Sequence, residues 1–150
     1  MTRWFALVAL LLGLDQAAKA LVQHDMALGE SIPLIPGLFH LTYVQNHGAA
    51  FGILQGYDGV FFLCGTAVAA AAVWFGFRYR QHGALVNTLA LITAGAIGNL
   101  IDRARLGAVV DFFDFRIWPV FNLADCWIVV GAGLLFYFLV LRQPVEEESR

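Results

Sequence analysis

Four apolar stretches, each about as long as a membrane-spanning helix, dominate the sequence and leave few architectures open to it. They cover Trp4–Val22, Val60–Phe77, Ala84–Ile101 and Phe121–Leu141. A helix needs about 20 mostly apolar residues to cross a bilayer core of about 30 Å. The composition agrees, because 60% of the 150 residues are hydrophobic and 13% are charged. The sequence predicts one membrane domain over residues 1–150, an all-α bundle of four transmembrane helices.

The basic residues predict how this bundle is oriented. An even number of spans places both termini on one side of the membrane, and the segment Gln23–Gly59 contains no Lys or Arg. Since basic residues collect in cytoplasmic loops, both termini are expected on the cytoplasmic side of the membrane. The basic residues at the ends on that side are Arg3, Arg78, Arg80, Arg142 and Arg150. An alternative treats the first span as a cleaved secretory signal peptide, because Arg3, an apolar run and "AKA" at Ala18–Ala20 imitate one.

The outer segment, about residues 23–59, is expected to form a small β-sheet. Within it, Leu34–Ile53 alternates apolar and polar residues after a Pro-Gly turn signal. We therefore expect an antiparallel sheet lying against the outer leaflet.

Several ionisable residues occur inside or at the ends of the spans. Each costs roughly 2.5–3.5 kcal/mol at a helix centre, so each is a candidate functional residue. Asp15 and Lys19 are four residues apart, which favours a structural ion pair on one helix face. Asn99, Asp102 and Arg103 share one face at the outer end of the third span, which favours a polar pocket.

Asp111 and Asp125 form the second candidate group. Asp111 is predicted on the loop that enters the fourth helix, and Asp125 in the first turn of that helix, where Asn122 could serve as the cap. Capping alone would explain Asp125 but not Asp111. If the two carboxylates converge, they share one proton and can act as a general acid and a general base on one water.

The sequence lacks suitable residues for serine-nucleophile or metal-dependent catalysis. The serines, Ser31 and Ser149, lie in the outer segment and the C-terminal tail, so neither is a credible nucleophile. The histidines have no metal-binding spacing, and the cysteines Cys64 and Cys126 lie in apolar runs, so we expect no metal or cofactor. The basic residues are too scattered for nucleic-acid binding.

Five short motifs resemble those of the lipoprotein signal peptidase family, also called signal peptidase II. They follow in order around the four spans and extend from Asp15 to about Ile128. The motifs are "DQAAK" (Asp15–Lys19), "NHGAAFG" (Asn46–Gly52), "GAIGNLIDR" (Gly95–Arg103), "VVDFFDF" (Val109–Phe115) and "FNLAD" (Phe121–Asp125). The chain departs from the family in having Ala94-Gly95 where a glycine pair is common, and in a short connection between Asp111 and Asp125.

The resemblance implies an aspartyl endopeptidase of the bacterial inner membrane that removes the signal peptide from diacylglyceryl-modified prolipoproteins, cutting before the lipidated cysteine. It implies an outer sheet cradle and a short lid between Gln23 and Gly59. Asp111 and Asp125 correspond to the family's catalytic aspartates. Asn46, Gly48, Asn99, Arg103, Asn122 and Ala124 would line the pocket, while Asp15, Lys19 and Asp102 would hold the helices. The expected partners are this substrate and membrane lipid, and the chain is expected to be a monomer.

Two other functions remain open from the residues alone. A small transporter or proton-conducting bundle could use the same carboxylates as relay sites, although the polar residues gather at the outer end. A purely structural membrane subunit is the third possibility. Asp114, three residues after Asp111 and beside Arg116, is expected to be a solvated or ion-paired residue at the rim.

Overall fold

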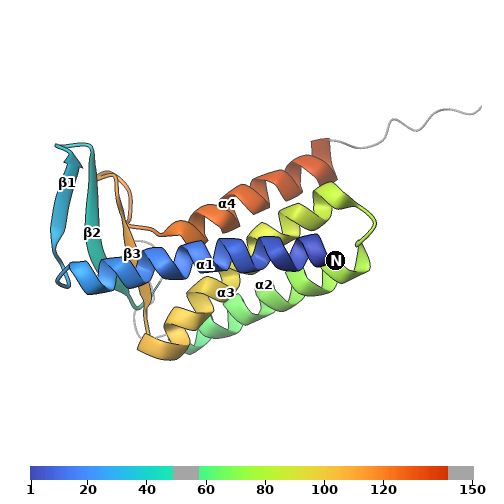
Figure 1. Cartoon of the computed structure of the whole chain (residues 1–150), viewed down its shortest axis with the longest axis horizontal. Coiled ribbons are helices and arrows are strands. Elements are labelled where there is room, and N and C mark those ends of the chain that lie inside the picture. Colours follow the sequence, from blue (N-terminus) through green and yellow to red (C-terminus); the bar gives the residue numbers. More distant parts are fainter. Residues whose placement is uncertain (49–57, 142–150) are drawn as a thin grey trace, which may run out of the picture.

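In residues 1–48 and 58–141, which the computed structural model describes, four long helices form a bundle with a three-stranded sheet at one end (Figure 1). The helices are α1 (Thr2–Asp25), α2 (Asp58–Arg78), α3 (Gly83–Leu106) and α4 (Leu123–Phe136), and α4 continues as a π-helical turn, Tyr137–Leu141. All four are long and apolar enough to span a membrane. The predicted fold class is therefore confirmed.

Helix α3 is the centre of the bundle and packs against α1, α2 and α4. In its most apolar window 56% of the residues are buried, compared with 11–22% in the other three helices. Small residues permit the close approach. A Cβ atom at Gly131 of α4 would lie 2.7 Å from Cγ1 of Ile92. Because lipid removes most of the hydrophobic drive for helix association, such contacts hold the helices together.

The ends of α3 and α4 carry the residues that matter for the site. α3 continues to Leu106, beyond the predicted end at Ile101, and stops at Gly107, whose φ of 68° is left-handed. The additional turn places Asp102 and Arg103 on the helix. α4 begins at Leu123, two residues after the predicted start, because Asn122 caps it.

The sheet has the order β1–β2–β3, and its strands are β1 (Ser31–Ile35), β2 (Phe39–Asn46) and β3 (Val109–Asp114). Both strand pairs are antiparallel, and Val44 of β2 lies opposite Asp111 of β3. The predicted sheet is thus present in β1 and β2. At the two ends of the predicted segment, residues 23–25 belong to α1 and residues 58–59 to α2, while residues 49–57, which include part of the expected lid region, lie outside the described residues.

The third strand corrects the prediction that Asp111 lies on a loop. β3 is buried along nearly its whole length, so its sequence shows no alternation of polar and apolar residues. A strand that is covered on both faces gives a nearly continuous apolar run, which periodicity cannot distinguish from other buried segments. Pairing with β2 therefore fixes Asp111 on a rigid strand.

The sheet is attached to the C-terminal end of α1. A cluster of buried side chains joins the two, consisting of Val22 from the helix, Met26 immediately after it, and Tyr43, Val110 and Phe112 from the sheet. The N-terminus and the far end of α4 lie at the opposite end of the bundle (Figure 1). The first helix is thus an integral part of the bundle, and the contacts of Asp15 and Lys19 described below reinforce this.

Candidate active site

A cavity of about 350 Å³ lies where the sheet meets the ends of α3 and α4. Asp111 from β3 and Asp125 from the first turn of α4 both line it, so the fold brings the two carboxylates to one space. Its lining residues are Asn46, Gly48, Phe61, Asn99, Arg103, Val109, Asp111, Trp118, Pro119, Val120, Phe121 and Asp125.

Backbone pairing between β3 and the residue before the helix cap explains why the two aspartates lie near each other. The backbone N–H groups of Phe112 and Phe113 donate to the carbonyl oxygen of Phe121, at 3.0 and 2.8 Å, and the Phe121 N–H donates back to Phe113 at 3.1 Å. The chain therefore folds back along β3 immediately before α4 begins. Asp111 and Asp125, which are fourteen positions apart in the sequence, are therefore close in space.

Asp125 is held by a reciprocal cap with Asn122. The Asn122 side-chain oxygen accepts from the Asp125 backbone N–H at 3.0 Å, and Oδ2 of Asp125 accepts from the Asn122 backbone N–H at 3.2 Å. This arrangement satisfies free N–H groups at the start of α4, where the helix dipole also favours a negative charge. The capping role that the sequence suggested for Asp125 is present together with its position in the cavity.

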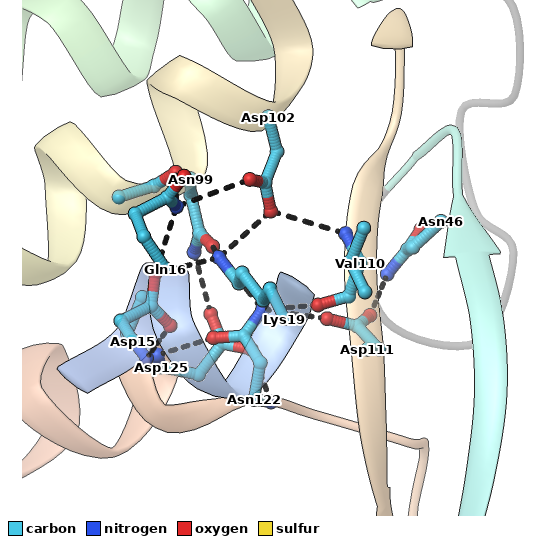
Figure 2. A network of polar contacts seen from close by, with 12 residues as sticks. Asp15, Gln16, Lys19, Asn46, Asn99, Asp102, Val110, Asp111, Asn122 and Asp125 are labelled. Atoms are coloured by element: carbon cyan, nitrogen blue, oxygen red, sulfur yellow. Dashed lines mark hydrogen bonds and ion pairs between the residues drawn. The ribbon is translucent and has the colours of Figure 1, made fainter. Parts of the chain in front are cut away.

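Asparagine side chains supply the remaining bonds to both carboxylates (Figure 2). Asn122 donates to Oδ1 of Asp111 at 2.7 Å, and Asn46 donates to Oδ2 of the same residue at 2.9 Å. Asn99 donates to Oδ1 of Asp125 at 2.8 Å. Each carboxylate thus accepts two N–H groups, which fixes its orientation, and Asn122 contacts both.

The environment of Asp111 favours its protonated form. Burial is the main cause, since the residue is only 2% exposed, and the negative charge of Asp125 is the second. These effects outweigh the hydrogen bonds from Asn46 and Asn122 and the charge of Lys19, and they raise the pKa of Asp111 to about 7. Such a group can hold a proton near neutral pH, as a general acid must.

A buried charged network lies behind the cavity, between α1 and α3. Nζ of Lys19 is 2.9 Å from Asp15 and 2.7 Å from Asp102, and it donates to Asn99 at 3.0 Å. The predicted i,i+4 pair of Asp15 and Lys19 is therefore confirmed as a contact. Gln16 joins the network by donating to Asp15, to Asp102 and to the Gly98 carbonyl oxygen, each at 3.2 Å.

The sequence interpretation did not single out Gln16. Gln16 belongs to the "DQAAK" motif and is a polar residue inside a span. Because burying a polar side chain is costly, its position in the sequence could have identified it in the same way as Asp15.

The other predicted pocket residues divide into two groups. Gly48 and Arg103 line the cavity, and the Arg103 guanidinium lies 5.8 Å from the centre of the Phe61 ring. Asn122 and Ala124 are fully buried and do not belong to the lining. Asn122 acts on the cavity through the two aspartates, and Ala124 lies where α4 approaches Gly95 and Gly98 of α3.

Asp114 is ion-paired, as expected, but it is not solvated. It is 5% exposed, accepts from the Thr42 hydroxyl at 2.7 Å and pairs with Arg116 at 2.9 Å. Burial acts to raise its pKa, but the bonds from Thr42 and Arg116 more than offset this, so the pKa lies below its ordinary value. Asp114 does not line the cavity, which separates it from Asp111 on the same strand.

Comparison with known proteins identifies the relatives of this chain. The family model described as "Signal peptidase (SPase) II" matches residues 7–141. A lipoprotein signal peptidase of Halothermothrix orenii is 48% identical over 141 residues, covering 94% of this chain and 97% of the relative.

Two further matches agree. A lipoprotein signal peptidase of Pelotomaculum thermopropionicum is 50% identical over 138 residues, covering 91% of this chain and 90% of the relative. A solved bacterial membrane enzyme structure superposes with a TM-score of 0.90 at 30% identity, covering 100% of this chain and 94% of that one. The chain therefore belongs to the signal peptidase II family.

Proposed function

We propose that Asp111 and Asp125 are the catalytic pair with which this signal peptidase II, an aspartic peptidase, removes the signal peptide from diacylglyceryl-modified prolipoproteins. The observation that carries the proposal is that both carboxylates line one cavity and accept hydrogen bonds from the same residue, Asn122. The family, and relatives named as lipoprotein signal peptidases, support the activity.

The proposed reaction is hydrolysis by one water held between the two carboxylates. The ionised carboxylate takes a proton as the water oxygen bonds to the carbonyl carbon before the lipidated cysteine. The protonated carboxyl gives its proton to the carbonyl oxygen. The C–N bond then breaks as the amine of the new N-terminal cysteine takes up a proton from the pair. One hydroxyl of the tetrahedral intermediate returns its proton to the ionised carboxylate, which leaves the new carboxyl group and restores the pair with one proton. The raised pKa of Asp111 supports its starting as the proton donor.

An apolar groove beside the cavity supports a lipidated substrate. It has a volume of about 620 Å³ and shares Trp118, Phe121 and Asp125 with the cavity. Its other lining residues are Phe115, Ile117, Cys126, Val129 and Val130. An acyl chain attached to the cysteine could pass from the cavity into this groove and remain in contact with lipid.

The polar residues of the bundle favour this function over a transporter or proton relay. Among the described residues, the buried polar side chains of the four spans lie near β3 and the start of α4 (Figure 2), apart from Thr88 and Thr93. Both threonine hydroxyls donate to carbonyl oxygens of their own helix. A relay needs polar groups along the whole span.

The same arrangement supports an orientation with the sheet outside. Arg78 and Arg80 lie at or just after the end of α2 and Arg3 lies near the N-terminus, at the end of the bundle opposite the sheet. Both termini would then be cytoplasmic, and the cavity would lie near the outer leaflet. The chain is proposed to act as a monomer without nucleic acid.

The decisive experiment measures cleavage of a diacylglyceryl prolipoprotein by the purified full chain in detergent micelles. Asp111→Asn and Asp125→Asn should each lower kcat on the order of 10³-fold or more. Asp114→Asn is the matched control, because Asp114 is a buried aspartate on the same strand but outside the cavity, and it should retain activity. Full activity in a folded Asp111 or Asp125 variant would contradict the proposal.

A further inference from the structure

Lys19 is buried behind the cavity without lining it, yet it contacts Asn99, which donates to Asp125 of the proposed catalytic pair. Its side chain is 2% exposed, and it comes from α1, a helix that contributes no residue to the cavity lining. An ammonium group has three hydrogens and no lone pair, so it can only donate. Those three hydrogens have three acceptors, namely Asp15, Asp102 and Oδ1 of Asn99.

The contact with Asn99 determines which way that amide faces. The oxygen and NH2 ends of an asparagine amide have nearly the same shape, so packing alone does not choose between them. With its oxygen toward Lys19, Asn99 presents NH2 to Oδ1 of Asp125 at 2.8 Å (Figure 2). In the flipped state two donors would meet at Lys19, and two acceptors would meet at Asp125.

Asn122 restrains the same amide more weakly. Its NH2 group has two hydrogens for three acceptors, which are Asp111 at 2.7 Å, Asn99 at 3.1 Å and the Val110 carbonyl oxygen at 3.2 Å. If the bond to Asn99 breaks, both hydrogens of the Asn122 NH2 group can still bond to the other two acceptors. Lys19 has no spare acceptor, because its three hydrogens have three acceptors, so breaking its bond to Asn99 leaves one hydrogen unbonded.

We infer that Lys19 is a positioning residue for the Asp111 and Asp125 pair, acting through the side-chain amide of Asn99. This inference rests on the proposed function, because it gives Lys19 a part in catalysis beyond the cohesion of the helices. The buried cation orients Asn99, Asn99 orients the Asp125 carboxylate, and the positive charge lies close to both catalytic groups. The two charged partners of the cation, Asp15 and Asp102, belong to α1 and α3.

The test compares Lys19→Met with Gln16→Met in the full chain, using diacylglyceryl prolipoprotein as the substrate. Both substitutions break contacts between α1 and α3, but only the first releases Asn99. Lys19→Met should lower kcat by on the order of 10- to 100-fold. Its KM should remain within about twofold, because the cavity lining is intact. Gln16→Met should reduce thermal stability while kcat per folded molecule stays near that of the parent protein.

Two further readouts separate positioning from a purely structural role. Burial and the charge of Asp125 raise the pKa of Asp111, and the charge of Lys19 lowers it, so Lys19→Met should move the alkaline limb of the kcat profile to higher pH. In addition, Lys19→Met should add little to the loss caused by Asn99→Leu, because both act through one contact.

Removing the cation alone leaves two buried carboxylates without their partner, so Lys19→Met/Asp102→Asn provides a variant with balanced charge. The inference would be overturned if the folded Lys19 variants kept the kcat and pH profile of the parent protein. It would also be overturned if the kcat losses of Lys19→Met and Asn99→Leu multiplied in the double variant, or if Gln16→Met lost as much kcat as Lys19→Met. Failure of both Lys19 variants to fold would also overturn it, since Lys19 would then serve folding alone. Inactivity of the parent protein itself would instead count against the proposed function.

Discussion

Asp15 of α1 accepts a hydrogen bond from the backbone N–H of Ala124, in the first turn of α4, at 2.9 Å. The same carboxylate pairs with Lys19 through its other oxygen. One side chain in the C-terminal half of the first helix thus satisfies a free N–H group at the start of the last helix, directly beside Asp125. This bond ties α1 to the turn that carries a proposed catalytic group.

Replacing Asp15 should therefore destabilise the bundle strongly. Asp15→Ala removes one member of a buried ion pair, which typically costs about 3–5 kcal/mol, and it also leaves the Ala124 N–H without its acceptor. Asp15→Asn keeps an oxygen for that N–H and should lose less. Thermal unfolding of the purified variants in detergent measures the difference, and equal stability of Asp15→Ala and the parent protein would refute this assignment.

The approach of α3 to α4 leads to a second prediction. A Cβ atom at Gly95 would collide with the carbonyl oxygen of Ala124 and would lie 2.8 Å from Cγ1 of Ile128, whereas a Cβ atom at Gly133 of α4 would meet nothing within 4 Å. Gly95→Ala should thus push α4 outward, lowering both the unfolding temperature and cleavage. Gly133→Ala is the matched control and should leave both unchanged. A Gly95→Ala protein as stable and active as the control would show that the contact can relax freely.

The sequence predicted the four spans and a small antiparallel sheet in the segment that contains β1 and β2, because hydropathy and alternation are local signals. It also singled out Asp111 and Asp125, because a carboxylate among apolar residues is costly wherever it lies. The strand that carries Asp111 was missed, since burial on both faces removes alternation. The roles of Asn99 and Asn122 depend on the pairing of β3 with Phe121 and on contacts from α1, which join residues far apart in sequence. Asp114 was expected to be a solvated or ion-paired rim residue; its pairing with Arg116 is local in sequence and was foreseen, but its burial beside Thr42 was not.

The apolar groove gives a third prediction, at its most exposed residue. Ile117 is 89% exposed, so Ile117→Asp should fold normally, but it places a charge where an acyl chain would pass. The KM for a diacylglyceryl prolipoprotein should rise several-fold, with kcat little changed. Leu38→Asp is the control, because Leu38 is an exposed apolar residue in the turn between β1 and β2 and outside the groove. Equal effects of the two substitutions would indicate general loss of contact with lipid rather than a substrate site.

The raised pKa of Asp111 gives a fourth prediction, which links activity to stability. The group titrates at about 7 in the native protein instead of at 3.8. Cleavage should decline as pH rises through about 7, because the pair loses its shared proton. Between about pH 4 and 7 the native state holds a proton that the unfolded chain has released. Stability should therefore fall with increasing pH over this range, by up to about 1.4 kcal/mol per pH unit from this group.

Asp111→Asn should remove that slope, because an amide resembles the protonated carboxyl and does not titrate. At pH 8 the variant should be inactive yet unfold at a higher temperature than the parent protein. Asp114→Asn should change stability in the opposite direction. The pKa of Asp114 is lowered in the native protein, so its ionised form stabilises the native state at pH values above its unfolded pKa. This variant should lose stability at pH 8 while cleavage continues. Unfolding temperatures measured in detergent from pH 5 to 8 test both variants, and an unchanged slope in Asp111→Asn would show that Asp111 does not carry the shared proton.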